Sequence, residues 1–390
     1  MTHLASKLEH FQESVIREMT RKALQHNAIN LSQGMPDYYP PKSLLTKLKE
    51  SINEDIHQYS VTYGRYDLRR EVAKKLKNYN KIKLDPEQEI TITCGASEAI
   101  SSSILAITNP KDEILILEPW YENYVPVTYL AGGKPKFVKL DDNNFSLNEE
   151  NLLSSINEKT KAIIINTPHN PTGKVFSLDE LKFISDICVD HDLIAITDEI
   201  YEYILFDRKK HISIASISDM YDRTITVSGF SKTFTITGWR IGYVGADYDL
   251  MTGIRKVHDY LTICAPTPLQ SAVLQSFELQ EEYYSMLRWR YQENRDFFIG
   301  ELAKLGLKPV MPFGAYYVLV DISDFKMSDR IFANFLVEDK GVATVPGTSF
   351  YQKGVKGINE GEKYVRFSFS HKMETLEEAI GRITKKIEKL

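Results

Sequence analysis

Short apolar segments alternate with helix-like segments through the middle of this chain. Five runs rich in Ile, Val, Leu and Thr lie between Glu89 and Gly245, namely EITITCG, DEILILEPW, KAIIINTP, LIAITDE and RTITVSG. Segments with helical spacing, such as Ser97 to Ile107 and Leu178 to Asp190, separate these runs. The pattern predicts an α/β fold in which a large domain holds a mostly parallel sheet between helices.

The last hundred or so residues follow a different pattern. A long polar helix is expected from Gln280 to Leu305 and another helix from Asp329 to Lys340, with strands at AYYVLVDI, GVATVPG and YVRFSFS. These elements predict a smaller α+β domain, and 390 residues suffice for two cores. We place the large domain at residues 46–284 and the smaller one, formed by both termini, at residues 1–45 and 285–390.

Charge and cysteine content narrow the class of partner. The net charge of -5 disfavours nucleic acid and anionic membranes as partners, so small molecules are the expected ligands. The three cysteines are far apart and have no metal-ligand spacing, which predicts neither a disulfide framework nor a metal site. The N-terminus lacks the apolar core of a signal peptide, and the longest uncharged run contains two prolines. We expect a cytoplasmic protein.

Unusual residues follow each apolar run, where an open parallel sheet binds its ligands. Lys232 follows the strand RTITVSG and a turn of small residues. Most lysines are solvated surface charges. A lysine at this sheet edge could instead be desolvated, which lowers its pKa and frees its amine to attack an aldehyde carbon.

Asp198 ends the strand LIAIT at the same edge of the sheet, and Tyr201 follows it by three residues. The carboxylate of Asp198 could be a helix N-cap or be satisfied by the backbone. Alternatively, a buried carboxylate favours the protonated form of a nearby ring nitrogen, because an opposite charge stabilises the charged form. Tyr201 could then reach an oxygen of the same ring.

Three further positions suggest a phosphorylated aromatic ligand. Gly95, Ala96 and Ser97 lie between a strand and a helix, where free backbone amides suit a phosphate. Arg240 is a second phosphate candidate, although it could equally form an ordinary surface ion pair. Tyr121, in EPWYENY, could stack on a ring or belong to the core.

The tetrapeptide Asn170-Pro171-Thr172-Gly173 is the most specific local motif, although by itself it could be a simple turn. The order and placement of four motifs resemble those of the class I and II aminotransferases. The motifs are NPTG, then DEIY, then SK, and then GWRIGY, whose arginine follows the lysine by eight residues. The resemblance runs from SQGMPDYYPP to YVRFSFS. It is strongest with the branch of methionine, glutamine, aromatic and kynurenine aminotransferases, in which QG-x-PD-x-x-PP is familiar.

This resemblance implies fold type I, a pyridoxal 5′-phosphate cofactor, and a role for each matching residue. Lys232 would hold the cofactor as a Schiff base and move the proton from the substrate's α carbon. Asp198 would pair with the pyridine nitrogen. The remaining cofactor contacts implied by the family are Gly95, Ala96, Ser97, Tyr121, Asn170, Tyr201, Ser231, Arg240 and, from a neighbouring subunit, Tyr59.

The substrate is expected to bind beside the cofactor. Arg366 would bind the α-carboxylate, with Gly34 and Asn170 nearby, although an arginine on an alternating strand could simply face solvent. A guanidinium holds a carboxylate in a fixed bidentate geometry. That geometry would leave the bond from the α carbon to its hydrogen perpendicular to the ring. Because HQYSVTYGRYDLR matches the segment that crosses the family's dimer interface, the resemblance implies a homodimer with a shared active site.

Two positions depart from the family pattern. Many members place a phosphate-binding serine three residues before the lysine, where this chain has Gly229, with Ser228 and Ser231 on either side. Ile263 lies where kynurenine-type relatives carry an aromatic residue, which disfavours kynurenine as the substrate. Trp120, Tyr121 and Tyr124 are aromatic residues expected near the site, and they favour a large neutral amino acid.

The sequence therefore predicts a ping-pong transamination between an α-amino acid, such as methionine, glutamine or an aromatic amino acid, and a 2-oxo acid. A C-S β-lyase with the same fold is the alternative enzyme. A non-catalytic regulator would need an added DNA-binding module, and only about thirty residues precede SQGMPD. A structural protein that has lost catalysis would not be expected to keep Lys232, Asp198 and Arg366 together.

Overall fold

The computed structural model describes residues 4–141, 144–354 and 359–387. Its centre is a seven-stranded sheet in the order β2-β8-β7-β6-β5-β3-β4. The strands are β2 (Ile90–Thr93), β3 (Glu113–Glu118), β4 (Lys134–Lys139), β5 (Thr160–Asn166), β6 (Ile194–Asp198), β7 (Thr224–Gly229) and β8 (Gly242–Gly245). β8 is antiparallel to both of its neighbours, and the pairs from β7 to β4 are parallel.

Helices cover both faces of this sheet, which explains why its strands are apolar throughout. Successive residues of a strand point to opposite faces. In β5, Ile163 and Ile165 pack with α7 (Leu178–Asp190) on one side of the sheet. Ile164 packs on the other side with α4 (Ala96–Ile107) and α8 (Tyr248–Thr262). A strand buried on both faces reads as a continuous run of Ile, Leu and Val.

A second sheet is antiparallel and has the order β12-β13-β10-β9. Its strands are β9 (Lys308–Pro309), β10 (Tyr317–Asp321), β12 (Val345–Pro346) and β13 (Tyr364–Ser368). A separate parallel pair joins β1 (Ile29–Asn30) to β11 (Val342–Ala343). A segment in the C-terminal part of the chain therefore pairs with a segment near its start.

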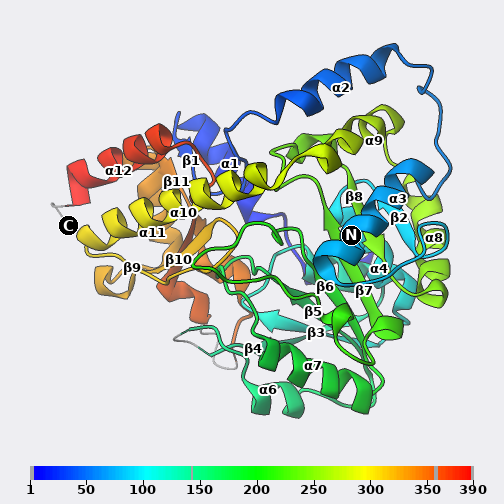
Figure 1. The fold of residues 1–390 in the computed structure, drawn as a ribbon. Coiled ribbons are helices and arrows are strands. Elements are labelled where there is room, and N and C mark those ends of the chain that lie inside the picture. The colour runs from blue at the N-terminus through cyan, green and yellow to red at the C-terminus, as the bar shows by residue number, and fades with distance from the viewer. Residues whose placement is uncertain (1–3, 142–143, 355–358, 388–390) are drawn as a thin grey trace.

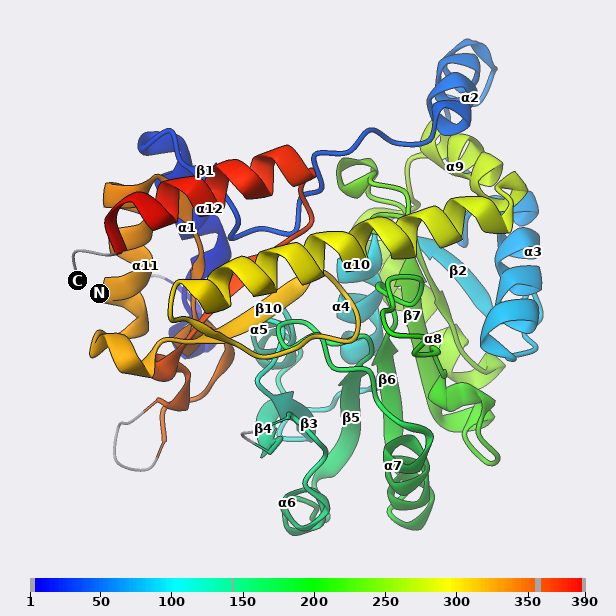
Figure 2. The same ribbon diagram turned by 60° about the vertical axis from the view of Figure 1, so that its left-hand side comes forward.

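The remaining helices fall into two groups. On the side of the second sheet lie α1 (Val15–Gln25), α11 (Asp329–Phe335) and α12 (Met373–Ile387), and the long helix α10 (Glu281–Lys304) runs from there toward the seven-stranded sheet. Around the seven-stranded sheet lie α3 (Tyr66–Lys75), α5 (Tyr124–Leu130) and α6 (Glu149–Ser154). α2 (Lys42–Asn53) stands away from the body and packs beside α9 (Thr267–Val273) (Figures 1 and 2).

The predicted α/β fold with a mostly parallel sheet between helices is confirmed, and all five predicted strands are present. β4 and β8 are additional strands, and both are harder to read from the sequence. β4 has three lysines among its six residues, whereas β8 is short and contains two glycines. The domain boundaries at residues 45/46 and 284/285 stay a prediction. Among the described residues, no helix is long and apolar enough to cross a membrane.

Candidate active site

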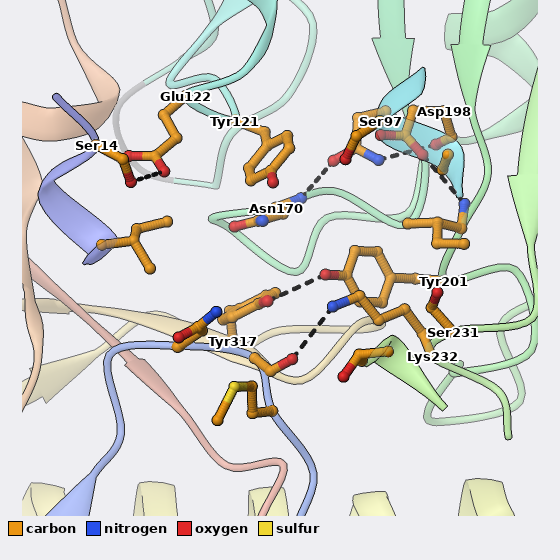
Figure 3. A pocket seen from close by; sticks show the side chains of 18 of the residues that line it. Ser14, Ser97, Tyr121, Glu122, Asn170, Asp198, Tyr201, Ser231, Lys232 and Tyr317 are labelled. Atoms are coloured by element: carbon orange, nitrogen blue, oxygen red, sulfur yellow. Dashed lines mark hydrogen bonds between the residues drawn. The ribbon is translucent and has the colours of Figure 1, made fainter. Parts of the chain in front are cut away.

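One cavity of about 460 Å³ lies between the seven-stranded sheet and the second sheet. Its floor comes from segments that follow the parallel strands, and they carry Asn170, Asp198 and Lys232. Tyr317 of β10 and Arg366 of β13 contribute from the second sheet. The cavity is thus assembled from parts of the chain that are far apart in sequence (Figure 3).

Lys232 follows β7 and its side chain enters the cavity (Figure 3). Its Nζ donates a hydrogen bond to the Gly34 carbonyl oxygen at 3.2 Å. Burial and the nearby charge of Arg240 lower the pKa of Lys232 from 10.5 to about 8, although Asp198 partly opposes the shift. At pH 7 roughly a tenth of the amine is therefore uncharged, far more than for an ordinary lysine, which makes it a usable nucleophile and base.

Asp198 is buried at the end of β6 and lines the same cavity. Its Oδ2 accepts a hydrogen bond from the Tyr124 hydroxyl at 2.8 Å, and its Oδ1 accepts one from the Ile200 N–H at 3.3 Å. Burial raises the pKa of Asp198 to about 6 despite these two donors. The carboxylate is still mainly ionised at neutral pH, so it can stabilise a cation placed against it.

Tyr201 and Tyr317 form a hydroxyl pair on the cavity wall, with 3.0 Å between their oxygens. Burial raises the pKa of both phenols, which keeps them protonated and able to donate. Gly34 lies against the pair, because a Cβ at this position would be 2.0 Å from the Tyr317 hydroxyl oxygen. The SQGMPD loop needs a glycine here to reach the cavity.

The turn before α4 has the features of an anion site. Gly95 has φ +80° and forms the N-cap of α4, so the N–H groups of Ala96 and Ser97 open the helix without intrahelical acceptors. The guanidinium of Arg240 lies beside this turn, since a Cβ on Gly95 would be 2.6 Å from its Nη2. Arg240 bonds the carbonyls of Thr237 and Cys94, at 2.9 and 3.4 Å. The surface ion pair considered for Arg240 is not formed within the described residues.

Gly229 has a packing reason to lack a side chain. A Cβ there would be 2.9 Å from the Gly242 Cα and 3.1 Å from the Ile241 carbonyl oxygen. The antiparallel partner β8 therefore leaves no room for the serine that many relatives carry. Ser231, two residues later, is buried and lines the cavity.

Asn170 and Gly173 of the NPTG motif have different roles, one in the cavity wall and one in packing. Asn170 lines the cavity, where its Oδ1 accepts a hydrogen bond from Arg366 at 2.8 Å. Gly173 has φ +71°, and a Cβ on it would be 2.1 Å from Pro312 Cβ. Its carbonyl oxygen accepts from the N–H groups of Phe313 and Gly314. The motif is a turn that also holds the second sheet against the first.

Arg366 is fully buried, so the solvent-facing alternative for this residue is wrong. Its guanidinium donates to Asn170 Oδ1 at 2.8 Å and to the Ser32 carbonyl oxygen at 2.5 Å. It also packs on the ring of Tyr317, with 4.3 Å from Cζ to the ring centroid. The Nε–H has no partner among the described residues. A buried guanidinium with spare donors and no carboxylate partner is suited to bind an anion.

The aromatic residues of the EPWYENY segment lie in three different environments. Tyr121 lines the cavity. Tyr124 instead positions Asp198, and Trp120 stacks on Phe137 with 4.3 Å between ring centroids. Tyr59, expected to act in a neighbouring subunit, is 75% exposed and is not part of this chain's cavity wall.

Tyr317 was not predicted as part of the site, and Tyr124 was expected near the site without its bond to Asp198. Nothing in AYYVLVDI tells which tyrosine faces the cavity, because that depends on how the two sheets pack. The bond from Tyr124 to Asp198 had a weak signal, since Tyr124 follows Tyr121 by three residues in a segment after a strand.

Comparisons with known proteins give a consistent result. A family model described as aminotransferase class I and II matches residues 26–383. The chain is 36% identical to an aspartate aminotransferase of Pyrococcus abyssi, covering 98% of this chain and 97% of that protein. It is 33% identical to human kynurenine–oxoglutarate transaminase 1 over 92% of each chain. A solved Escherichia coli protein with a methionine aminotransferase function superposes with a TM-score of 0.92 at 32% identity, covering 99% and 100% of the two chains.

Proposed function

This chain belongs to the class I and II aminotransferases, which use pyridoxal 5′-phosphate, and we propose that it transfers the amino group of a large neutral amino acid to a 2-oxo acid. The observation that carries the proposal is the convergence of Lys232, Asp198 and Arg366 on one cavity. Each of these three groups has a different chemical property that transamination needs.

The residues present fit the cofactor. A phosphate suits the opening of α4, where Gly95 leaves room and Arg240 supplies positive charge. A cationic ring nitrogen suits the ionised carboxylate of Asp198, and a ring oxygen suits the hydroxyl of Tyr201. Tyr121 offers an aromatic face on the same cavity. We propose that Ala96, Ser97, Asn170 and Ser231 complete the set.

When bound, pyridoxal 5′-phosphate supplies an aldehyde that takes up the amino group and a ring that accepts the electron pair left by the α proton. Lys232 holds the cofactor through its amine. The same amine, when free, would carry the proton away from the α carbon of the substrate, a task matched to a pKa near 8. Asp198 keeps the ring nitrogen protonated.

Arg366 binds the α-carboxylate and thereby orients the substrate. Its planar guanidinium is fixed by Asn170, the Ser32 carbonyl and the Tyr317 ring, so the bound carboxylate has one defined position. Gly34 lies next to this place and its carbonyl holds Lys232. Such fixed orientation favours loss of the proton over loss of carboxylate.

The walls beyond Arg366 support a large neutral side chain. Ile16, Met35, Tyr121 and Tyr317 are among the residues that line the cavity, and their side chains give it apolar and aromatic surface. Substrate names among the relatives differ, since they include aspartate, kynurenine and methionine. We therefore base the substrate class on the cavity wall and on the SQGMPDYYPP segment.

We propose that the enzyme is a homodimer whose active sites are shared. Exposed apolar residues gather on two neighbouring segments, with Tyr59 75%, Val61 64% and Tyr260 92% exposed. The hydrogen bond from the Thr62 hydroxyl to Asp259 Oδ1, at 3.3 Å, links these segments. An exposed apolar patch of this kind is typical of an interface. Ile263 belongs to it, so it would act in the partner's site rather than in its own.

We also propose a cytoplasmic location, supported by the free state of Cys94, Cys188 and Cys264, which fits a reducing compartment.

The test is an assay of the purified enzyme with methionine, glutamine, phenylalanine and aspartate as donors, in the presence of one neutral 2-oxo acid. The expected result is amino transfer from the first three with a much lower kcat/KM for aspartate. Release of pyruvate and ammonia from cystathionine without any 2-oxo acid would instead identify a C-S β-lyase. A preference for aspartate would contradict the proposed substrate class.

A further inference from the structure

The end of the cavity opposite Lys232 carries a charge to which the family motifs give no role. Ser14, Arg17 and Glu122 line this end, and although Glu122 belongs to the EPWYENY segment, none of the three has a role in the proposed reaction. Figure 3 shows Glu122 and Ser14 on one side of the cavity and Lys232 and Asp198 on the other, with Tyr121 and Asn170 between them. A substrate whose α-carboxylate is held by Arg366 would direct its side chain away from Lys232.

Glu122 is held in place by a defined contact. It lies between β3 and α5, is half-buried, and its Oε1 accepts a hydrogen bond from the Ser14 hydroxyl. The Ser14 hydroxyl oxygen in turn accepts from the Arg17 N–H at 3.2 Å, so it is fixed as the N-cap of α1. No other hydrogen bond or ion pair of Glu122 is formed within the described residues. The other carboxylate oxygen therefore has no hydrogen-bond partner among the described residues, and Glu122 lines the cavity.

The field of this carboxylate reaches the two aromatic walls. Burial raises the pKa of Tyr121, and the charge of Glu122 raises it further. Glu122 also adds to the rise for Tyr317, where burial is again the main cause. Tyr121 and Tyr317 both line the cavity. A charge close enough to act on both rings also acts on a substrate side chain that passes between them.

Apart from Lys232, Arg240 and Arg366, Arg17 is the only cation among the described residues that line the cavity, and it does not cancel Glu122. Its side chain is exposed, whereas Glu122 is half-buried. Solvent and salt screen an exposed charge far more than a partly buried one. The net electrostatic potential at the end of the cavity opposite Lys232, where the substrate side chain would lie, is therefore negative. A second carboxylate placed there would meet a like charge, which is costly at an interface that excludes water.

We propose that Glu122 is a specificity-determining residue, which rejects substrates whose side chain ends in a carboxylate and accepts neutral ones. The inference rests on the proposed function and identifies the residue that sets the substrate class. A carboxamide N–H, as in glutamine, can donate to the free oxygen of Glu122, and a thioether meets no penalty. Because a ping-pong enzyme binds donor and acceptor in one pocket, the same selection applies to the 2-oxo acid.

The test uses two ligands of equal length on the enzyme loaded with its cofactor. Glutarate carries a distal carboxylate where pentanoate carries a methyl group, and calorimetric titration measures the dissociation constant of each. Glu122→Gln removes the charge with little change in shape. We expect it to tighten glutarate binding by about tenfold and to change pentanoate binding by less than about threefold. Glu122→Asp, which keeps the charge, should leave both constants within about threefold of the original protein.

Kinetics with glutamine and glutamate as donors provide the second readout. Glu122→Gln should lower the ratio of kcat/KM for glutamine over glutamate by about tenfold or more. The inference is overturned if Glu122→Gln changes neither the glutarate constant nor this ratio. It is also overturned if Arg17→Gln weakens glutarate binding tenfold, because Arg17 would then dominate this end. If Glu122→Gln tightens glutarate binding as expected but the enzyme transfers no amino group, the proposed function is refuted and the role of Glu122 in selecting ligands is not.

Discussion

Asp198 and Glu199 are adjacent in the sequence, yet they belong to two buried regions that are built differently. Asp198 lines the active-site cavity, and its carboxylate accepts two hydrogen bonds. Glu199 lies outside the cavity wall and accepts four, from Thr197 and Ser213 on one oxygen and from Asn80 and His211 on the other. Four bonds fill the acceptor capacity of a carboxylate.

Glu199 is part of a group that we call the glutamate cluster, formed by Lys75, Asn80, Glu199, Glu202 and His211. Ligand atoms of Glu199, Glu202 and His211 lie within 4.8 Å of one another, a spacing that could hold a metal ion. The Lys75 ammonium, 2.5 Å from Glu202, already supplies positive charge there. In this protein, buried charges whose hydrogen bonds are filled therefore serve the fold, whereas those with spare capacity can bind ligands.

The largest effect on activity is expected from the removal of the Lys232 amine. Lys232→Ala should lower kcat/KM for transamination by about 10⁴-fold or more, because the amine acts both as the cofactor's anchor and as the proton carrier. Thermal unfolding should show no loss of stability. Lys182→Ala, at an exposed position of α7, is the matched control and should keep full activity. Activity within tenfold of the original enzyme would refute the role of Lys232.

A second substitution in the active site keeps the positive charge of Arg366 and changes only its geometry. Arg366→Lys should reduce kcat/KM by about 10²-fold, because an ammonium cannot give the bidentate contact and leaves Asn170 Oδ1 with a weaker partner. Initial rates over a range of amino acid concentrations measure this loss. An unchanged kcat/KM would mean that the α-carboxylate is bound elsewhere.

The glutamate cluster should respond in the opposite way. Glu202→Gln leaves Lys75, whose side chain is only 11% exposed, without its ion pair, which should cost about 3 kcal/mol of unfolding free energy. The kcat of the folded enzyme should stay within about threefold, since the cluster does not reach the cavity. Urea denaturation of the apoprotein gives the first quantity. The double variant Lys75→Met with Glu202→Gln should recover part of the stability, and a loss confined to activity would contradict the account.

A smaller effect is expected from pH. Lys232 has a pKa of about 8 when folded and an ordinary value of 10.5 when unfolded, so the unfolded chain binds more protons between these values. The free energy of unfolding of the apoprotein should therefore gain a contribution as pH rises from about 8 to 10.5, and Lys232→Met should remove this contribution. Competitive acetylation should find Lys232 reactive at lower pH than Lys182. Equal reactivity profiles would show that Lys232 is not desolvated.

Much of this molecule could be predicted from its sequence, for identifiable physical reasons. Strands buried on both faces leave continuous apolar runs, so all but two strands of the large sheet were visible. Lys232, Asp198 and Asn170 could be located because they follow such strands, and the carboxyl ends of parallel strands meet. These residues depend on local sequence and on one simple rule of sheet geometry.

The remaining features depend on contacts between distant segments. Tyr317 enters the cavity only because the second sheet packs on the first, through Gly173 and the segment after Pro312. Arg366 enters it for the same reason, and it was predicted from the family resemblance and not from local sequence. Gly229 replaces the expected serine because β8 approaches closely, and β8 itself was not predicted. The pairing of Ser14 with Glu122 spans 108 positions and leaves no local signal.

The central claim, that Lys232 carries the cofactor, can be tested by reduction with sodium borohydride after pyridoxal 5′-phosphate has been bound. Reduction fixes the cofactor to the amine that holds it, and mass spectrometry of the digested protein then locates the added mass. The account predicts the label on the peptide containing Lys232 and its absence from Lys232→Ala. A label on another buried lysine, such as Lys174, or no label at all, would contradict it.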